Sequence, residues 1–155
     1  MKVERIDHIH AYAKDVDAAA KLFGEIFGSE FGPPWESAEW GCRACFHPLG
    51  FEFLQPTEAN KIVAQTVGKR SEGVLAISLK VPNMEEAIAE MESRGIKLLH
   101  FFQVGQNKEA TFEATNTFGV QIELCEYPGD DIIKASVGPV RSMSRDEWFR
   151  QRGQL

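Results

Sequence analysis

The sequence lacks several features that define specialised classes of protein. It has three cysteines in 155 residues, and an odd count without a secretory leader argues against a disulfide framework. No apolar run approaches the length of a membrane span, and the first residues carry no long apolar stretch. No basic stripe stands out in a chain of net charge −6. We therefore expect a cytoplasmic protein with no nucleic-acid or membrane partner.

The cysteines also offer little evidence of a metal centre. Cys42 and Cys45 form a C-x-x-C sequence, but no second copy completes a zinc site. Alternation along a strand would send the two side chains to opposite faces. We interpret them as small apolar strand residues in a folded chain that is 43% hydrophobic and 26% charged.

The first third of the chain has the pattern of a strand, a helix and further strands. Residues 6–13 alternate as a half-buried strand does. An apolar helical stripe follows, and either Asp15 or Asp17 can cap it. Two strands are predicted over residues 41–47 and 51–55, joined by a turn at Pro48, Leu49 and Gly50.

The same order of elements returns later in the chain. A strand begins near Gly73, and Asn83 with Glu86 forms a capping box for a second helix. Three more strands are predicted over residues 96–102, 109–116 and 120–126. Residues 8–19 align with residues 76–87 without a gap, and Phe51–Leu54 aligns with Ile122–Cys125. The sequence thus predicts an α+β protein made of two tandem βαβββ modules.

The module boundaries follow from this repeat. The first module covers residues 1–56, a connector covers 57–72, and the second module covers 73–127. A C-terminal tail of residues 128–155 follows, with a short helix expected over 142–152 and Ser144 as its cap.

Strand alternation separates a helix-covered face from a polar face. Apolar residues such as Ala11 and Leu79 belong under the helices. The opposite face then carries imidazole, amide and carboxylate groups, one or two on each strand. These groups belong to His8 and His10, Glu52, and Gln121 with Glu123, and the same face carries Ala76, Ser78 and Cys125. Matching positions in two repeats would converge on a pseudo-twofold axis, so we expect one central site there.

Four segments resemble the vicinal oxygen chelate superfamily, and the resemblance covers residues 4–127. They are Ile6–Ile9, Lys14–Val16, Phe23–Gly28 and Gly119–Leu124. This superfamily includes glyoxalase I, methylmalonyl-CoA epimerase, extradiol dioxygenases and the bleomycin- and fosfomycin-resistance proteins. The chain is most similar to the epimerase and glyoxalase I group, through Glu39–Cys42 and Phe51–Pro56. The resemblance implies a cupped mixed sheet with the helices on its outer face.

The resemblance also implies one divalent metal ion held by the first and last strands of each module. The corresponding positions are His8, Glu52, Ala76 and Glu123, and a methyl group at Ala76 cannot replace the usual histidine. One imidazole and two carboxylates can still hold Mn, Co, Fe, Mg, Ni or Zn, with zinc less favoured than in a two-histidine site. Alternatively His10 or His100 supplies the missing ligand, or metal binding has been lost.

The chemistry that the resemblance implies is that of a metal-dependent lyase, isomerase or epimerase. Its substrate would be a small carbonyl or thioester compound that reacts through a metal-stabilised enolate. Glu123 and Glu52 are the candidate ligands or bases, and Glu39 is a further acid/base candidate. The substrate pocket is expected to include His10, Arg43, Ala76, Ser78 and Lys80.

Two other expectations accompany this one. The alternative function is metal-free ligand binding on the same fold, as in the resistance proteins, and Ala76 is its main support. Ring cleavage of a catechol is less expected, because it needs a second histidine where the chain has Ala76. Relatives commonly dimerise, so a homodimer is expected.

Overall fold

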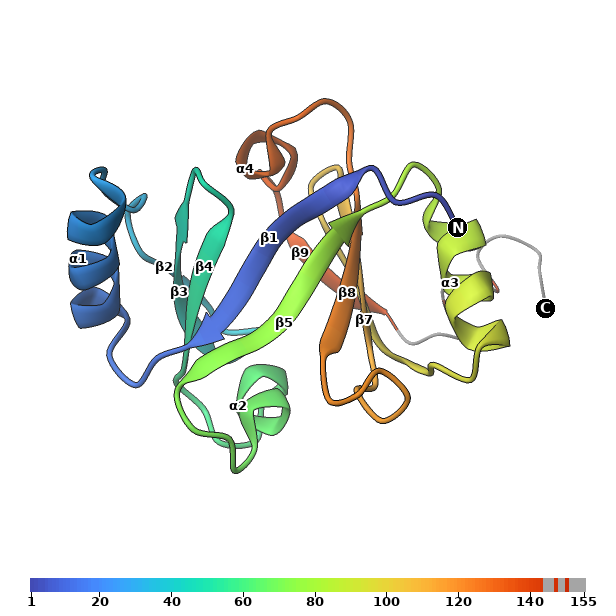
Figure 1. Cartoon of the computed structure of the whole chain (residues 1–155), viewed down its shortest axis with the longest axis horizontal. Coiled ribbons are helices and arrows are strands. Elements are labelled where there is room, and N and C mark those ends of the chain that lie inside the picture. The colour runs from blue at the N-terminus through green and yellow to red at the C-terminus, as the bar shows by residue number, and fades with distance from the viewer. Residues whose placement is uncertain (144–146, 148–149, 151–155) are drawn as a thin grey trace. The chain divides into compact units, whose positions relative to one another are not determined.

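The computed structural model describes residues 1–143, 147 and 150, and it has the predicted α+β composition (Figure 1). The chain forms two compact units. The first unit is His8–Ala76, and the second unit combines Met1–Asp7 with the chain from Ile77 onward. Two long strands, β1 (Arg5–Tyr12) and β5 (Gly73–Lys80), therefore contribute residues to both units.

The first unit follows the βαβββ order. After β1 come α1 (Val16–Phe27), β2 (Trp35–Ser37), β3 (Cys42–His47), β4 (Phe51–Pro56) and α2 (Ile62–Val67). The strand order is β2-β3-β4-β1, in which β1 and β4 are parallel and the other pairs are antiparallel. The sheet is therefore mixed, as predicted. The β2 strand was not expected, because three residues after a Gly/Pro-rich stretch give no periodic signal.

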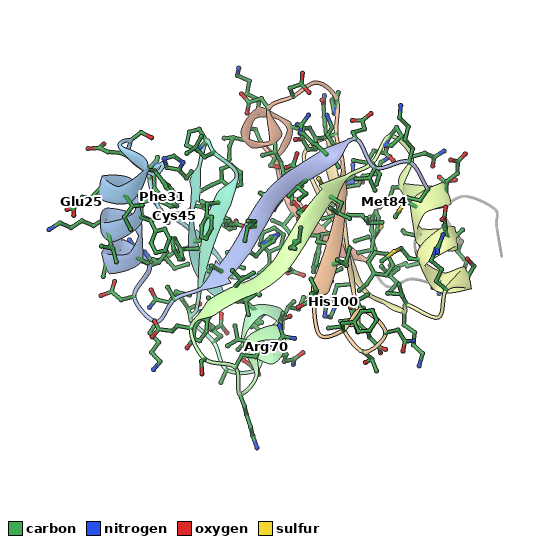
Figure 2. The ribbon with its side chains drawn as sticks, viewed as in Figure 1. Glu25, Phe31, Cys45, Arg70, Met84 and His100 are labelled. Atoms are coloured by element: carbon green, nitrogen blue, oxygen red, sulfur yellow. The ribbon has the colours of Figure 1, made fainter. Side chains whose placement is uncertain are left out.

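The helix α1 covers one face of β3 and β4 (Figure 1). The Asp15 side chain caps it by accepting a hydrogen bond from the amide of Ala18, and Gly28 ends it with a φ of 72°. Its apolar stripe packs on a core of buried residues, with Phe31 and Cys45 on the same side of β3 (Figure 2). That core contains Ala11, Ala13, Val16, Cys45 and Phe53. The predicted position of Ala11 on the helix-covered face of β1 is thereby confirmed.

A second apolar cluster of the first unit lies under α2. It contains Cys42, Val63, Val67, Leu75 and Ala76. Cys42 and Cys45 thus belong to different clusters on opposite faces of β3, as strand alternation predicted. Val63 and Val67 of this cluster belong to α2, so part of the segment expected as a connector is a helix that packs on the sheet.

The second unit repeats the order with its own helix. After the end of β5 come α3 (Met84–Ser93), β6 (Leu98–Val104), β7 (Asn107–Phe112), β8 (Gln121–Glu126), α4 (Ile132–Ala135) and β9 (Val140–Met143). The strand order is β5-β8-β7-β6-β9. The predicted strands are present within a few residues of their expected ends.

The core of this unit lies between α3 and its sheet. Asn83 caps α3 by accepting hydrogen bonds from the amides of Glu85 and Glu86. Buried side chains of the helix pack against apolar residues of β6, β7 and β8. The core contains Val81, Met84, Ala87, Ile88, Met91, Phe101, Ala110, Phe112 and Leu124. Since Leu79, Ile122 and Leu124 are all in or against this core, the predicted helix side of β5 and β8 is confirmed.

The C-terminal tail continues the sheet of the second unit. Its strand β9 pairs antiparallel with β6, a connection that the sequence pattern did not indicate. Ser142 and Met143, where a helix was expected to begin, lie in β9. Of the rest of that prediction only Glu147 and Arg150 are described, and both are helical, whereas Ser144 as the cap lies outside the described residues. Within the described part of the chain, no helix is long and apolar enough to cross a membrane.

Candidate functional site

His8, His10 and Glu52 form a polar cluster on the face of the first unit that α1 does not cover. Strands β1 and β4 are parallel neighbours, and their register places His10 directly beside Glu52. The Nδ1 atom of His10 is 2.8 Å from Oε2 of Glu52, and Nε2 of His8 is 4.0 Å from the same oxygen. One ligand atom from each of the three residues lies within 4.8 Å of the other two.

The three side chains of the cluster are largely buried. The side chain of His8 is 2% exposed, whereas those of His10 and Glu52 are each 12% exposed. The centroid of the His8 ring is 4.4 Å from that of the His10 ring. It is 5.5 Å from the centroid of the Phe46 ring, in an edge-to-face arrangement. A carboxylate in such a place needs cationic or hydrogen-bonding partners, since burial without them is costly. Here His10 lies at hydrogen-bonding distance from Glu52.

The imidazole rings of His8 and His10 lie closer together than the separation of their Cα atoms suggests. Two residues of strand separate the Cα atoms of His8 and His10 by about 6.6 Å, which would be awkward for a shared ion. The side chains nevertheless lean together over Glu52. Backbone spacing alone was a poor guide because a long side chain can lean along its strand.

The second unit carries its own buried polar face. Glu123 on β8 is 5% exposed, and its register partner on β7 is Thr111. Gln121 and Ser78 are also buried. The atoms Oε1 of Gln121 and Oγ1 of Thr111 are buried without a hydrogen-bond partner in the described part of the chain. Buried polar atoms in a native fold are normally satisfied, so such atoms mark a place where a ligand or water can bind.

Sequence reasoning placed Gln121 on this face but gave Thr111 no role. The signal that identifies Thr111 is its register with Glu123, which no single-sequence pattern contains. Glu123 belongs to the second unit, whereas His8 and Glu52 belong to the first unit. The convergence of these three residues on one site stays a prediction.

Two cationic side chains that were expected to line the substrate pocket have protein partners in the structure. Arg43 lies on the α1 side of β3, where it forms an ion pair with Asp17 and lies 3.7 Å from Glu36. Lys80 donates a hydrogen bond to the carbonyl of Gly129, and its ammonium lies 4.2 Å from the centre of the Tyr127 ring. Both side chains therefore have structural roles that explain their conformation without a substrate.

Three further candidate residues are exposed, packed among apolar side chains or half-buried. Glu39 is exposed in the turn between β2 and β3. Ala76 packs in the apolar cluster under α2, where it contributes only a methyl group. His100 is half-buried on β6 beside Phe102, and burial lowers its pKa below the ordinary value for histidine.

The cysteines are poor candidates for nucleophiles. Burial raises the pKa of Cys42 to about 12, with a smaller contribution from the negative charge of Glu52. Burial likewise raises the pKa of Cys45 to about 11. The pKa of Cys125 is raised further by the same cause. All three are thiols at neutral pH, and the thiolate is the reactive form.

Comparison with known proteins identifies relatives of the whole fold. Residues 7–115 match the sequence profile of the Glyoxalase/Bleomycin resistance protein/Dioxygenase superfamily. The mitochondrial methylmalonyl-CoA epimerase of Bos taurus is 24% identical over 99 residues, which are 61% of this chain and 57% of that protein. The chain thus spans less than two thirds of the length of this curated relative.

Solved structures show the same fold. A Streptomyces coelicolor methylmalonyl-CoA epimerase variant in complex with 2-nitronate-propionyl-CoA is 21% identical, with a TM-score of 0.70. The alignment covers 83% of this chain and 100% of that one. A methylmalonyl-CoA epimerase in complex with methylmalonyl-CoA and NH4+ is also 21% identical with a TM-score of 0.70, over 89% of this chain and 100% of the other.

Proposed function

Because the chain belongs to the Glyoxalase/Bleomycin resistance protein/Dioxygenase superfamily, we propose that it is an isomerase or epimerase of the vicinal oxygen chelate type. Its substrate would be a small acyl thioester such as methylmalonyl-CoA, the compound named in its epimerase relatives. The reaction would remove and return a proton on the carbon next to the thioester carbonyl. The epimerase relatives favour this reaction over a lyase reaction on a small carbonyl compound.

One observation carries this proposal, and it is the buried Glu52 carboxylate between two imidazoles. A proton next to a carbonyl is weakly acidic, so its removal needs a positioned base shielded from water. Glu52 is held 2.8 Å from His10, and its side chain is 12% exposed. It can therefore meet a substrate while the neighbouring imidazoles orient its oxygens.

Epimerisation needs a second proton carrier, since the proton leaves one face of the carbon and returns to the other. Glu123 is the candidate in the second repeat, where it aligns with Glu52 of the first repeat. It is buried on β8, where its register partner on β7 is Thr111. Glu39 is a weaker candidate because it is exposed.

The donors of the first unit fit a divalent metal ion. Two imidazoles and one carboxylate, with ligand atoms within 4.8 Å of one another, match the chemistry of transition-metal sites. When bound, such an ion supplies Lewis acidity that lowers the energy of negative charge on a carbonyl oxygen. His8 and Glu52 of this cluster are the two ligands that the sequence also predicts, and Glu123 is the third residue of that predicted set.

The reaction is tested by isotope exchange in D2O. Methylmalonyl-CoA is incubated with the full chain, and mass spectrometry follows the replacement of the hydrogen on its second carbon by deuterium. We expect exchange well above the protein-free rate. Glu52→Gln and Glu123→Gln should each lower the rate by about 100-fold or more, which is the usual contribution of a general base.

A matched control separates this effect from a general loss of charge. Glu58 is an exposed carboxylate of the first unit, so Glu58→Gln should leave the exchange rate unchanged. EDTA treatment should abolish exchange, and added Co2+ or Mn2+ should restore it. Full exchange in EDTA-treated protein would contradict metal dependence, and unchanged exchange in both glutamate variants would contradict their role.

The alternative function is metal-free ligand binding. The observation that favours it is Ala76, which occupies the position of a usual histidine ligand and packs among apolar side chains. Calorimetric titration with methylmalonyl-CoA distinguishes the two functions. Binding with no deuterium exchange under any metal condition would favour the binding protein. The expected homodimer is tested separately by light scattering during gel filtration.

A further inference from the structure

The two repeats differ in where they carry imidazole groups. The alignment that pairs His8 with Ala76 also pairs His10 with Ser78. The first repeat therefore has two histidines at positions where the second repeat has a methyl and a hydroxyl group. Both histidines come from one strand and lie on the same face of the first unit as Glu52.

The distances among these three side chains suit a shared ion. Metal–nitrogen and metal–oxygen bonds in zinc sites are about 2.0–2.2 Å long, so two ligands of one ion lie about 3–4 Å apart. The two contacts to Oε2 of Glu52 are 2.8 Å from His10 and 4.0 Å from His8. Small side-chain rotations would bring all three atoms to bonding distance, because they already lie within 4.8 Å of one another.

We propose that His10 is a metal ligand and that His8, His10 and Glu52 together bind one divalent ion within the first unit. His10 takes over the role of the imidazole that is missing at position 76. The side chain of His8 is almost fully buried, whereas those of His10 and Glu52 each keep 12% of their surface exposed. A site with three protein ligands leaves a fourth position of the ion for water or substrate.

The ligand set determines the class of ion. One imidazole with two carboxylates would accept Mg2+ or Mn2+, whereas two imidazoles with one carboxylate favour borderline ions such as Zn2+, Co2+ and Fe2+. We therefore expect Zn2+ and Co2+ to bind more tightly than Mg2+. The sequence predicts that zinc is less favoured at a one-histidine site than at a two-histidine site, and the pair His8 and His10 removes that disadvantage.

The test measures binding of the metal alone to the full chain, without substrate. Equilibrium dialysis against Co2+ and Zn2+ should give one equivalent per chain, and bound Co2+ should show visible absorption bands. His10→Ala, His8→Ala and Glu52→Gln should each weaken binding by about 100-fold or more, since even partners of a ligand contribute 10- to 100-fold. His10→Gln is a second variant that keeps a polar side chain at this position.

His100 provides the matched control. It is a half-buried strand histidine of the second unit, and it is the competing candidate for the missing ligand. His100→Ala should bind Co2+ as tightly as the unaltered chain. Loss of binding in His100→Ala but not in His10→Ala would overturn the proposal. Circular dichroism of each variant separates an unfolded protein from a folded one that has lost its ligand.

This proposal rests on the proposed function only for the use of His8 and Glu52 as ligands, and the two can fail separately. One bound Co2+ without deuterium exchange would support the metal site and contradict the isomerase. Exchange that proceeds without metal, with no Co2+ bound at micromolar concentrations, would contradict the metal site alone. Unchanged Co2+ affinity in folded His10→Ala and His10→Gln would show that His10 is not a ligand.

Discussion

The hydroxyl group of Tyr127 donates a hydrogen bond to the carboxylate of Asp7, which precedes it by 120 residues. The side chain of Asp7 is 3% exposed and also lies 3.2 Å from the guanidinium of Arg5. Burial and the neighbouring Asp7 both raise the pKa of Tyr127, so it stays a donor at neutral pH. The bond joins the start of the chain to the end of the second βαβββ module.

We expect Tyr127→Phe to lower the free energy of unfolding by about 1.5–3 kcal/mol, the usual contribution of a hydrogen bond to a charged group. The phenyl ring keeps the packing, so the loss reports the two hydrogen bonds of the hydroxyl group, one donated to Asp7 and one accepted from Arg5. Urea denaturation followed by tryptophan fluorescence measures it. Tyr12→Phe removes the other tyrosine hydroxyl of the chain and is the matched comparison. An equal loss in both variants would contradict the special role of the bond to Asp7.

Stability should also depend on the ionisation of His100. Burial lowers its pKa in the folded protein, so the unfolded chain binds a proton more readily than the folded one. As the pH falls from 7 through the ordinary histidine value of 6.5, this difference reduces stability until the folded protein is protonated as well. His100→Gln should therefore flatten the stability curve between about pH 7 and 5. A curve of unchanged slope in this variant would contradict the prediction.

The thiol groups should be inert in the folded protein. Cys42, Cys45 and Cys125 are buried, and their raised pKa values leave little thiolate at pH 8. We expect Ellman's reagent to find no rapidly reacting thiol in native protein and three in 6 M guanidinium chloride, one for each cysteine. A native thiol that reacts within seconds would show that one of these sites opens to solvent. The cysteine variants Cys42→Ala and Cys45→Ala would then identify it.

The fold could be predicted from the sequence because its signals are local and repeated. Alternation in β1 and β5, the caps at Asp15 and Asn83, and the stops at Gly28 and Gly95 each report a short segment. The strands β2 and β9 gave no such signal. One is three residues long and the other four, so pairing with β3 and β6 defines them, not their own pattern.

The site was less predictable than the fold, for a related reason. The polar face of each strand follows from alternation, which identified His8, His10, Glu52 and Glu123. Which of these side chains meet depends on strand register and rotamer. The pairing of His10 with Glu52 is a property of the parallel β1–β4 register, and a single sequence contains no record of it. The engagement of Lys80 with Gly129 depends on a turn far along the chain.

The division of β1 between the two units has a consequence for attempts to take the protein apart. Residues 1–7 belong physically to the second unit, where the amide of Glu4 bonds to the carbonyl of Lys80 and Arg5 reaches Asp130 at 2.9 Å. A gene cut in the connector would give an N-terminal fragment bearing a segment that hydrogen-bonds to Lys80, Tyr127 and Asp130 on the other fragment. The two halves are thus repeats in sequence, but the second unit needs the first seven residues of the chain to be complete.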